Sequence, residues 1–280
     1  GCRPVPHMSG MAPDDWLGTL RDLPGVSPRL VGVVLFLGGW QVLSLFFPQS
    51  QFPGLGRLAE NLVVIFSNET RFDVVENYSM TIQRILAGFA VSMVVGTFVG
   101  ILMGTNQFLE DYLTTPVMTF LSFPALIWAF LGILWFGLTD YLVAIFTIVM
   151  VVTPYVIVNV WEGTNDLDQD LVQMARSFDA SRRQVWRDIY LPHLNPYMLA
   201  TTRLALSLSW KILLVAELFG AQVGIGSVVN SYYLNFRADM IIAWALPIMV
   251  LMFGFERLLR RLEARLFAWR PELDNQEAAA

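Results

Sequence analysis

The sequence predicts an all-α membrane protein that crosses the bilayer six times. Apolar residues make up 55% of its 280 residues and charged residues only 15%, a balance more apolar than a soluble domain of this size needs. Several apolar runs approach the about 20 residues that a helix needs to cross about 30 Å of hydrocarbon. Polar segments separate these runs, so we interpret each run as one helical span.

Two spans and a surface helix are predicted first. Residues 30–47 form the first span, which stops at Pro48 because proline cannot continue a helix. The polar connection 49–78 contains an amphipathic run that predicts a helix on the membrane surface. Its apolar positions are Leu55, Leu58, Leu62, Val63 and Phe66. Residues 81–103 form the second span. Along it, a seam of small residues spaced four apart allows another helix to approach closely. The seam consists of Gly88, Ser92, Gly96 and Gly100.

The remaining spans are predicted at residues 116–136, 141–161, 196–217 and 240–255. The first of these is expected to be a single span despite Pro124. A turn at 137–140 and a glycine-rich connection at 219–237 join neighbouring spans. Residues 29–270 thus form the membrane domain, and residues 1–28 and the acidic residues 271–280 are expected to be tails.

Residues 166–192 are the longest clearly polar segment between apolar runs, and their pattern predicts two short helices. Asp166 and Asp168 occupy positions suited to an N-cap and a first-turn acid of the first helix. Apolar residues at helical spacing predict one stripe on that helix. The stripe consists of Leu167, Leu171, Ala175 and Phe178.

The second helix of this segment begins with a capping-box pattern. Ser181 is followed three residues later by Gln184, so each can bond to the other's backbone amide. Asp179 and Ala180 form the turn before it, and Pro192 is expected to end it. The segment could be an ordinary loop whose arginines only orient the chain, or a docking element for a soluble partner.

Positive charge predicts the orientation, since cytoplasmic loops are enriched in Lys and Arg. If residues 166–192 are cytoplasmic, most of the arginines lie inside. They are Arg3, Arg21, Arg29, Arg176, Arg182, Arg183, Arg187, Arg257, Arg260, Arg261, Arg265 and Arg270. The outer segments then hold Arg57, Arg71, Arg84 and Arg237. An even number of spans places both tails on the cytoplasmic side with the loop.

The 166–192 segment resembles the "EAA" loop of ABC importer permeases. Residues 173–175, Asp179 and residues 189–192 follow its pattern of Glu-Ala-Ala, Gly and Ile-x-Leu-Pro. Gln173, Met174 and Asp179 depart from the pattern, while the remaining signature positions match. The departure at Asp179 is mild because Asp tolerates left-handed turn geometry better than most residues.

This resemblance implies an inner-membrane permease subunit of a binding-protein-dependent importer, with the MetI-like permease fold. The segment, which we call the coupling loop, would dock separate ATPase subunits that hold the ATP and Mg. No G-x-x-x-x-G-K-[S/T] motif occurs in this chain, so no cofactor is expected in it. A second permease chain, identical or similar, is also implied. The coupling residues would be Gln173, Met174, Ala175, Arg176, Ser177, Asp179, Ala180, Ser181, Arg182, Arg183, Leu191 and Pro192.

Residues 81–89, 123–125, 135–137 and 217–226 resemble the permeases for sulfonates, taurine and nitrate. The resemblance implies that the last of these stretches meets an extracytoplasmic solute-binding protein at the outer mouth. The contact residues would be Glu217, Gly220, Gly224 and Gly226.

Polar residues within the spans are candidates for the solute path, because ionisable groups are costly there and are often functional. The candidates are Ser122, Pro124, Trp128, Arg203, Ser207 and Lys211. Two alternatives remain open: Arg203 extends to the interface, and Lys211 forms a structural tie to Glu217 or another span.

Composition also bears on other functions. A net charge of −5 argues against nucleic-acid binding. With one cysteine and two histidines, neither a thiolate cluster nor a three-histidine zinc site is possible, and we expect no enzyme. The expected function is the permeation of a small solute, an anion such as a sulfonate, taurine or nitrate. A stand-alone secondary carrier is the alternative, although no clear internal repeat is visible. An intramembrane hydrolase is poorly supported because no predicted span contains a histidine.

Overall fold

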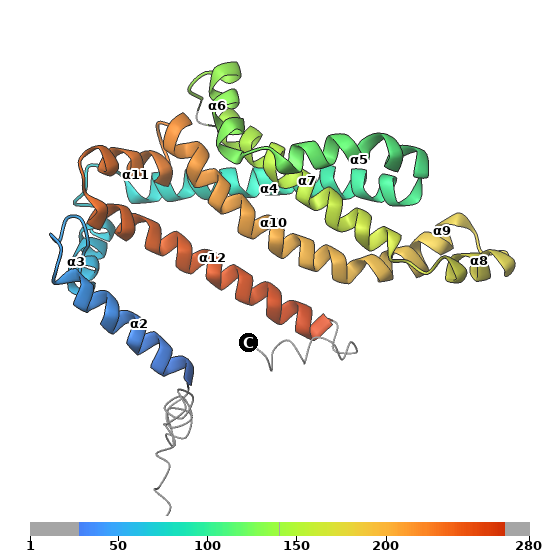
Figure 1. Cartoon of the computed structure of the whole chain (residues 1–280), viewed down its shortest axis with the longest axis horizontal. Coiled ribbons are helices and arrows are strands. Elements are labelled where there is room, and N and C mark those ends of the chain that lie inside the picture. The colour runs from blue at the N-terminus through green and yellow to red at the C-terminus, as the bar shows by residue number, and fades with distance from the viewer. Residues whose placement is uncertain (1–27, 140, 267–280) are drawn as a thin grey trace, which may run out of the picture.

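The computed structural model describes residues 28–139 and 141–266, and the regular structure within them is helical. Helices α4 (Val74–Thr105), α7 (Leu142–Asn165) and α10 (Leu191–Gly220) run along one another and form the body of the molecule (Figure 1). Helix α12 (Ala238–Leu266) packs against α10. The predicted tails 1–28 and 271–280 lie outside the described residues except for Pro28.

Four helical segments within the described residues are long and apolar enough to cross a membrane. They are Val74–Thr105, Leu142–Asn165, Arg182–Gly220 and Ala238–Arg261. Helices α5 (Gln107–Ser122) and α6 (Ala125–Phe136) make a fifth crossing only if the pair counts as one broken span. Helix α2 (Pro28–Ser44) contributes a shorter apolar helix. The all-α membrane fold is therefore confirmed, while the count of six spans is reached only with the broken pair and α2.

The predicted single span at 116–136 is wrong in form. The chain leaves the helix at Phe123 and Pro124, which have extended ψ values of 128° and 130°, and the helix axis turns by 94°. The residue before a proline is pushed out of the α region by contact with the proline ring, which explains the break. Helix α5 begins earlier than predicted, at a cap in which Asn106 accepts a hydrogen bond from the Phe108 amide (3.0 Å). As a result α6 stands away from the long axis of the molecule (Figure 1).

The small-residue seam on α4 packs against α7, as its spacing predicted for a close helix contact. A Cβ atom added at Gly96 would lie 2.5 Å from the Cβ of Val156, and one at Gly100 would lie 2.8 Å from the Ile157 carbonyl oxygen. Contacts this short are possible only for glycine, so the seam sets the distance between the two helices.

The main core lies where α4, α7, α10 and α12 meet, around buried aliphatic residues such as Val152, Leu213 and Ile248. A second cluster surrounds Trp244 at one end of the molecule, where helices α3 (Leu55–Phe66) and α11 (Ile225–Leu234) also lie (Figure 1). The predicted α3 helix is present. Its predicted apolar face is divided, because Leu58 is buried against the protein while Val63 and Phe66 are exposed.

Candidate functional site

The coupling loop forms two short helices at the end of the molecule opposite α3 and α11 (Figure 1). They are α8 (Gln169–Ser177) and α9 (Arg182–Val185), the latter followed by a π-helical turn, η1 (Trp186–Tyr190). The predicted capping box at the second helix is confirmed: the Ser181 amide donates to Gln184 Oε1 (2.8 Å), and the Gln184 amide donates to Ser181 Oγ (3.4 Å).

The start of α8 lies two residues later than predicted. Asp168 is its N-cap and accepts a hydrogen bond from the Asp170 amide (2.9 Å). Asp166 instead ends α7, where its carboxylate accepts a hydrogen bond from the Tyr197 hydroxyl. Aspartates at alternate positions 166, 168 and 170 offered more than one possible cap, so sequence alone did not select the right one.

The later start of α8 also changes which residues face α9. Leu167, Val172 and Val185 form the small core between the two helices, with Ala175 at its edge. The predicted stripe is therefore half wrong: Leu171 is 44% exposed and Phe178 is 81% exposed.

These exposed residues give the coupling loop an apolar outer surface beside cationic groups. Leu171 and Met174 lie three residues apart on α8, Phe178 follows four residues later as the C-cap, and all three are exposed. Arg182 and Arg183 are exposed at the start of α9. A clustered apolar surface rimmed by charges is typical of a protein contact site.

The turn between α8 and α9 confirms the prediction for Asp179. This residue has a φ of 57°, in the left-handed region that glycine adopts most easily. Asp179 therefore adopts the backbone geometry that glycine provides in the EAA pattern. The Ala180 amide then bonds back to the Ala175 carbonyl oxygen (3.1 Å) and closes the turn.

The predicted helix end at Pro192 is wrong. The π-helical turn η1 precedes it, and the Leu191 amide bonds to the Trp186 carbonyl oxygen, five residues back. Pro192 then lies in the first turn of α10, where its missing N–H is tolerated. The helical segment Arg182–Gly220 consequently continues for 39 residues from the coupling loop into the membrane body.

Three of the predicted path residues lie at the α5–α6 break. Ser122 lines an open groove and donates its hydroxyl proton to the Met118 carbonyl oxygen (3.0 Å). The groove is lined by Thr114, Thr115, Met118, Thr119, Ser122 and Phe123. Pro124 is exposed at the N-cap of α6, and Trp128 is buried with its ring stacked 5.4 Å from that of Phe120.

The other three predicted path residues share a face of α10. Arg203 and Ser207 are half-buried, and Lys211 is exposed with its Nζ 5.9 Å from the centre of the Trp210 ring. The groove on α5 does not include these three residues. The structure thus brings together two subsets of the predicted path, each on its own element, and a path joining them stays a prediction.

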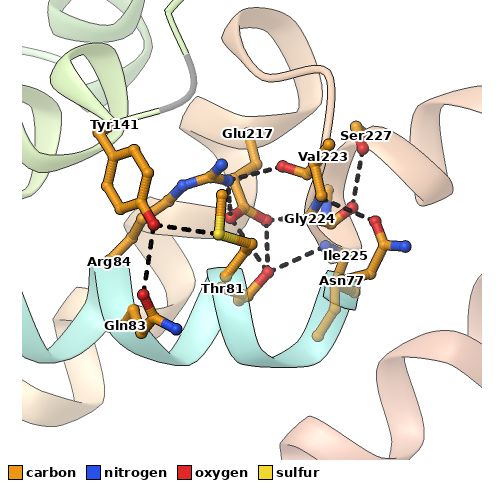
Figure 2. Close-up of polar contacts among 12 residues, drawn as sticks. Asn77, Thr81, Gln83, Arg84, Tyr141, Glu217, Val223, Gly224, Ile225 and Ser227 are labelled. Carbon is orange, nitrogen blue, oxygen red and sulfur yellow. Dashed lines mark hydrogen bonds and ion pairs between the residues drawn. The ribbon is translucent and has the colours of Figure 1, made fainter. Parts of the chain in front are cut away.

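Glu217 lies in a buried polar network rather than at a surface (Figure 2). Its carboxylate accepts hydrogen bonds from Arg84 Nη1 (2.6 Å), from Thr81 Oγ1 (2.9 Å) and from the Gly226 amide (3.0 Å). The Arg84 and Glu217 side chains are both completely buried. Arg84 also donates to the Val223 carbonyl oxygen (2.7 Å).

The expected outer-mouth contact residues lie in this interior. Glu217, Gly220, Gly224 and Gly226 are all buried in this conformation, and their contact with a binding protein stays a prediction. The glycines permit close approach: Gly224 has a φ of 128°, and a Cβ there would lie 2.6 Å from a carboxylate oxygen of Glu217.

Two related predictions are corrected. The ionic partner of Glu217 is Arg84, so the proposed tie from Lys211 to Glu217 is wrong. Arg84, counted among the outer-segment arginines, is buried within helix α4 and is not an exposed loop residue. A usable signal was present in the sequence, because an Arg and a Glu within separate apolar runs are expected to pair.

Sequence reasoning missed a second buried acid at the same end. Asp239 accepts hydrogen bonds from Arg237 Nε (2.8 Å) and Nη2 (2.9 Å) and from Asn61 of α3 (3.1 Å). The hydrogen bonds from Arg237 to Asp239 raise the pKa of the Arg237 guanidinium above its ordinary value. The cluster fastens α3 to the start of α12.

Comparison with known proteins places this arrangement among transport proteins. Residues 92–268 match the family model described as binding-protein-dependent transport system inner membrane component. The bicarbonate transport system permease protein CmpB of Synechococcus elongatus is 30% identical over 234 residues, covering 80% of this chain and 83% of that protein. The taurine transport system permease protein TauC of Escherichia coli is 27% identical over 231 residues, or 82% of each chain.

Two further similarities extend this result. The nitrate import permease protein NrtB of Synechococcus elongatus is 27% identical over 213 residues, covering 74% of this chain and 76% of that protein. A chain of the MetNI methionine ABC transporter, in an inward-facing conformation, superposes with a TM-score of 0.59 at 18% identity. The match covers 66% of this chain and 92% of that one, and it shows a shared fold.

Proposed function

The chain belongs to the binding-protein-dependent transport system inner membrane component family, a family of transport permeases rather than enzymes, and on that premise we propose that it forms the membrane path for a small anion and is driven by separate ATPase subunits. It is a multi-pass membrane protein and a permease subunit of an ABC importer. Three parts of this function are our proposals: the coupling to ATPase subunits, the identity of the solute and the orientation of the chain in the membrane.

The observation that carries the coupling proposal is the outer surface of the coupling loop. Leu171, Met174 and Phe178 are exposed on or directly after α8, and Arg182 and Arg183 are exposed at the start of α9. Both helices lie at one extremity of the molecule (Figure 1). The apolar side chains can enter a groove on a soluble partner, and the arginines can pair with its acidic rim. The ATP and Mg would be held by that partner.

Continuity of the helix supports the proposed mechanism. The second helix of the coupling loop passes without a loop into α10 as Arg182–Gly220. When ATP binding draws two ATPase subunits together, displacement at the docked loop would tilt α10 within the membrane. Tilting in this chain and in a second permease chain would alternate the path between outward-open and inward-open states.

Charge supports a cytoplasmic coupling loop. Besides the loop arginines, Arg257, Arg260 and Arg261 are exposed near the end of α12. Cytoplasmic segments are enriched in such residues, so we place the loop and the end of α12 inside the cell. An extracytoplasmic solute-binding protein would then approach the opposite end, where the turn between α10 and α11 lies.

The proposed solute class rests on chemistry shared by the relatives. Bicarbonate, nitrate and taurine, which the names of these relatives specify, each carry an oxyanion group. The exposed ammonium group of Lys211 is suited to such a group. We therefore propose a small oxyanion, with Lys211 as the cationic contact.

The deciding experiment reverses charge at the docking surface. The double variant Arg182→Glu with Arg183→Glu should lose copurification of the ATPase and ATP-driven uptake into proteoliposomes. The matched control, Arg257→Glu with Arg260→Glu, changes the same number of exposed arginines outside the loop and should retain both. ATPase binding that survives reversal at the loop would exclude this surface as the dock. Uptake by the purified chain without any ATPase would favour a secondary carrier instead.

A further inference from the structure

Helix α11 receives its amino-terminal cap from two other helices. Its own N-cap residue, Gly224, provides no side-chain hydrogen bond. We propose that Arg84 and Glu217 are positioning residues for transport. They hold α11 to both α4 and α10, so that α11 moves when the distance between these two helices changes during a transport cycle. This inference rests on the proposed function, in which α10 moves.

The first observation is that three successive amides are capped by side chains from elsewhere (Figure 2). The Gly224 amide donates to Asn77 Oδ1 (2.8 Å), and the Ile225 amide donates to Thr81 Oγ1 (2.9 Å). The Gly226 amide donates to Glu217 Oε2 (3.0 Å). The first amides of a helix lack partners within the helix, and they carry partial positive charge that favours a carboxylate. Without α4 and α10, α11 would begin with unsatisfied buried donors.

The second observation is the arrangement of the donors and acceptors on α4. Asn77, Thr81 and Arg84 lie four and three residues apart, so they occupy one face of that helix. Asn77 accepts from the Gly224 amide, and Thr81 accepts from the Ile225 amide and donates to the Glu217 carboxylate. Arg84 donates to the same carboxylate and to the Val223 carbonyl. N–H···O hydrogen bonds in proteins have donor–acceptor distances of about 2.7–3.2 Å. A slide of α4 against α10 by about 1 Å would therefore break several of these bonds at once.

The third observation is that the network contains a fully buried ion pair. Arg84 and Glu217 are 0% exposed, with Nη1 and Oε1 2.6 Å apart. Burial of two charges has a desolvation cost that often equals the attraction gained, so an apolar pair of similar size could stabilise the fold equally well. What an apolar pair could not do is hold the Gly226 amide and the Val223 carbonyl in place. The ion pair therefore positions the start of α11, in addition to any effect it has on the stability of the fold.

The primary test measures the α11 cap directly in the assembled transporter, in lipid nanodiscs with its ATPase. Thr81→Val keeps both charges of the ion pair and removes only the hydroxyl that joins Glu217 to the Ile225 amide. We expect hydrogen exchange of the amides at 224–228 to accelerate by about tenfold, since a buried donor loses its acceptor. Thr147→Val is the matched control, because Thr147 is equally buried and its hydroxyl donates to the Val143 carbonyl of its own helix.

The second test separates position from stability. In Arg84→Met with Glu217→Leu, an apolar pair replaces the ion pair, and we expect thermal stability close to that of the wild type. Exchange at 224–228 should nevertheless accelerate about tenfold, and the maximal rate of ATP-driven uptake should fall more than the apparent KM changes. If this variant does not assemble, Thr81→Val decides alone.

Either of two results would overturn the inference: unchanged exchange at 224–228 in Thr81→Val, or full transport by the assembled apolar pair. Both are distinguishable from failure of the proposed function, which is tested on the wild type by omitting the ATPase. Hydrogen exchange of the amides at 224–228 reports on the start of α11 whether or not an ATPase drives transport.

Discussion

Substitution of Gly96 by alanine should loosen the packing between α4 and α7, although alanine is the better helix former. The two effects oppose each other. In a helix interior, replacing glycine with alanine stabilises by about 0.5–1 kcal/mol. Against this, the new methyl group would lie 2.5 Å from Val156 Cβ and 2.6 Å from Val156 Cγ1. Carbon atoms in favourable contact are about 3.5–4.0 Å apart, so the helices would have to separate by about 1 Å.

Overpacking should prevail because the contacted atoms cannot turn away. Val156 is β-branched and completely buried, and the Thr153 carbonyl oxygen lies 3.1 Å from the new methyl position. Overpacking a dense core typically costs about 1–3 kcal/mol, which exceeds the gain in helix propensity. We therefore expect a net loss of about 1–2 kcal/mol in the free energy of unfolding.

The assay is denaturant unfolding of the purified protein in detergent, followed by circular dichroism. Gly38→Ala is the matched control: Gly38 lies in α2 with nothing within 4 Å of its added Cβ, so this change should be neutral or stabilising. If Gly96→Ala is as stable as Gly38→Ala, the close α4–α7 approach does not determine stability.

Three further outcomes follow from single side chains. Asp179→Gly should leave the free energy of unfolding and ATP-driven uptake unchanged, because glycine adopts a φ of 57° without strain. Asp179→Val should lower the free energy of unfolding by about 1–2 kcal/mol. Equal stability of the two variants would contradict this reasoning. Phe178→Ser should preserve the thermal stability of the isolated chain, since Phe178 is 81% exposed, yet reduce copurification of the ATPase. Lys211→Met should reduce anion uptake while ATPase binding persists, and unimpaired uptake would remove Lys211 from the proposed path.

Features encoded by neighbouring residues were predictable. The capping box of Ser181 and Gln184, the left-handed turn at Asp179 and the glycine seam on α4 all appear in the structure as the sequence indicates. Each depends on residues within one or two helical turns, or on the absence of a side chain. Such local rules are insensitive to how the helices are arranged.

The errors arose where tertiary contacts choose among local options. Pro192 ends a helix by local rules, but a π-helical turn before it shifts the hydrogen-bond register and lets α10 continue. At the other end, Glu217 follows an apolar run and resembles a residue emerging at the surface. Its buried partner is Arg84, which lies 133 positions earlier in the chain, so the pairing could be predicted only by comparing distant segments.

The uninterrupted segment Arg182–Gly220 has a mechanical consequence. Its 39 residues correspond to about 58 Å of helix, nearly twice the thickness of the hydrocarbon layer. One end carries the exposed arginines of the coupling loop and the other carries the Glu217 carboxylate. In the proposed mechanism, no loop along this length would absorb a displacement, so movement at the coupling loop would reach Glu217 through one continuous backbone.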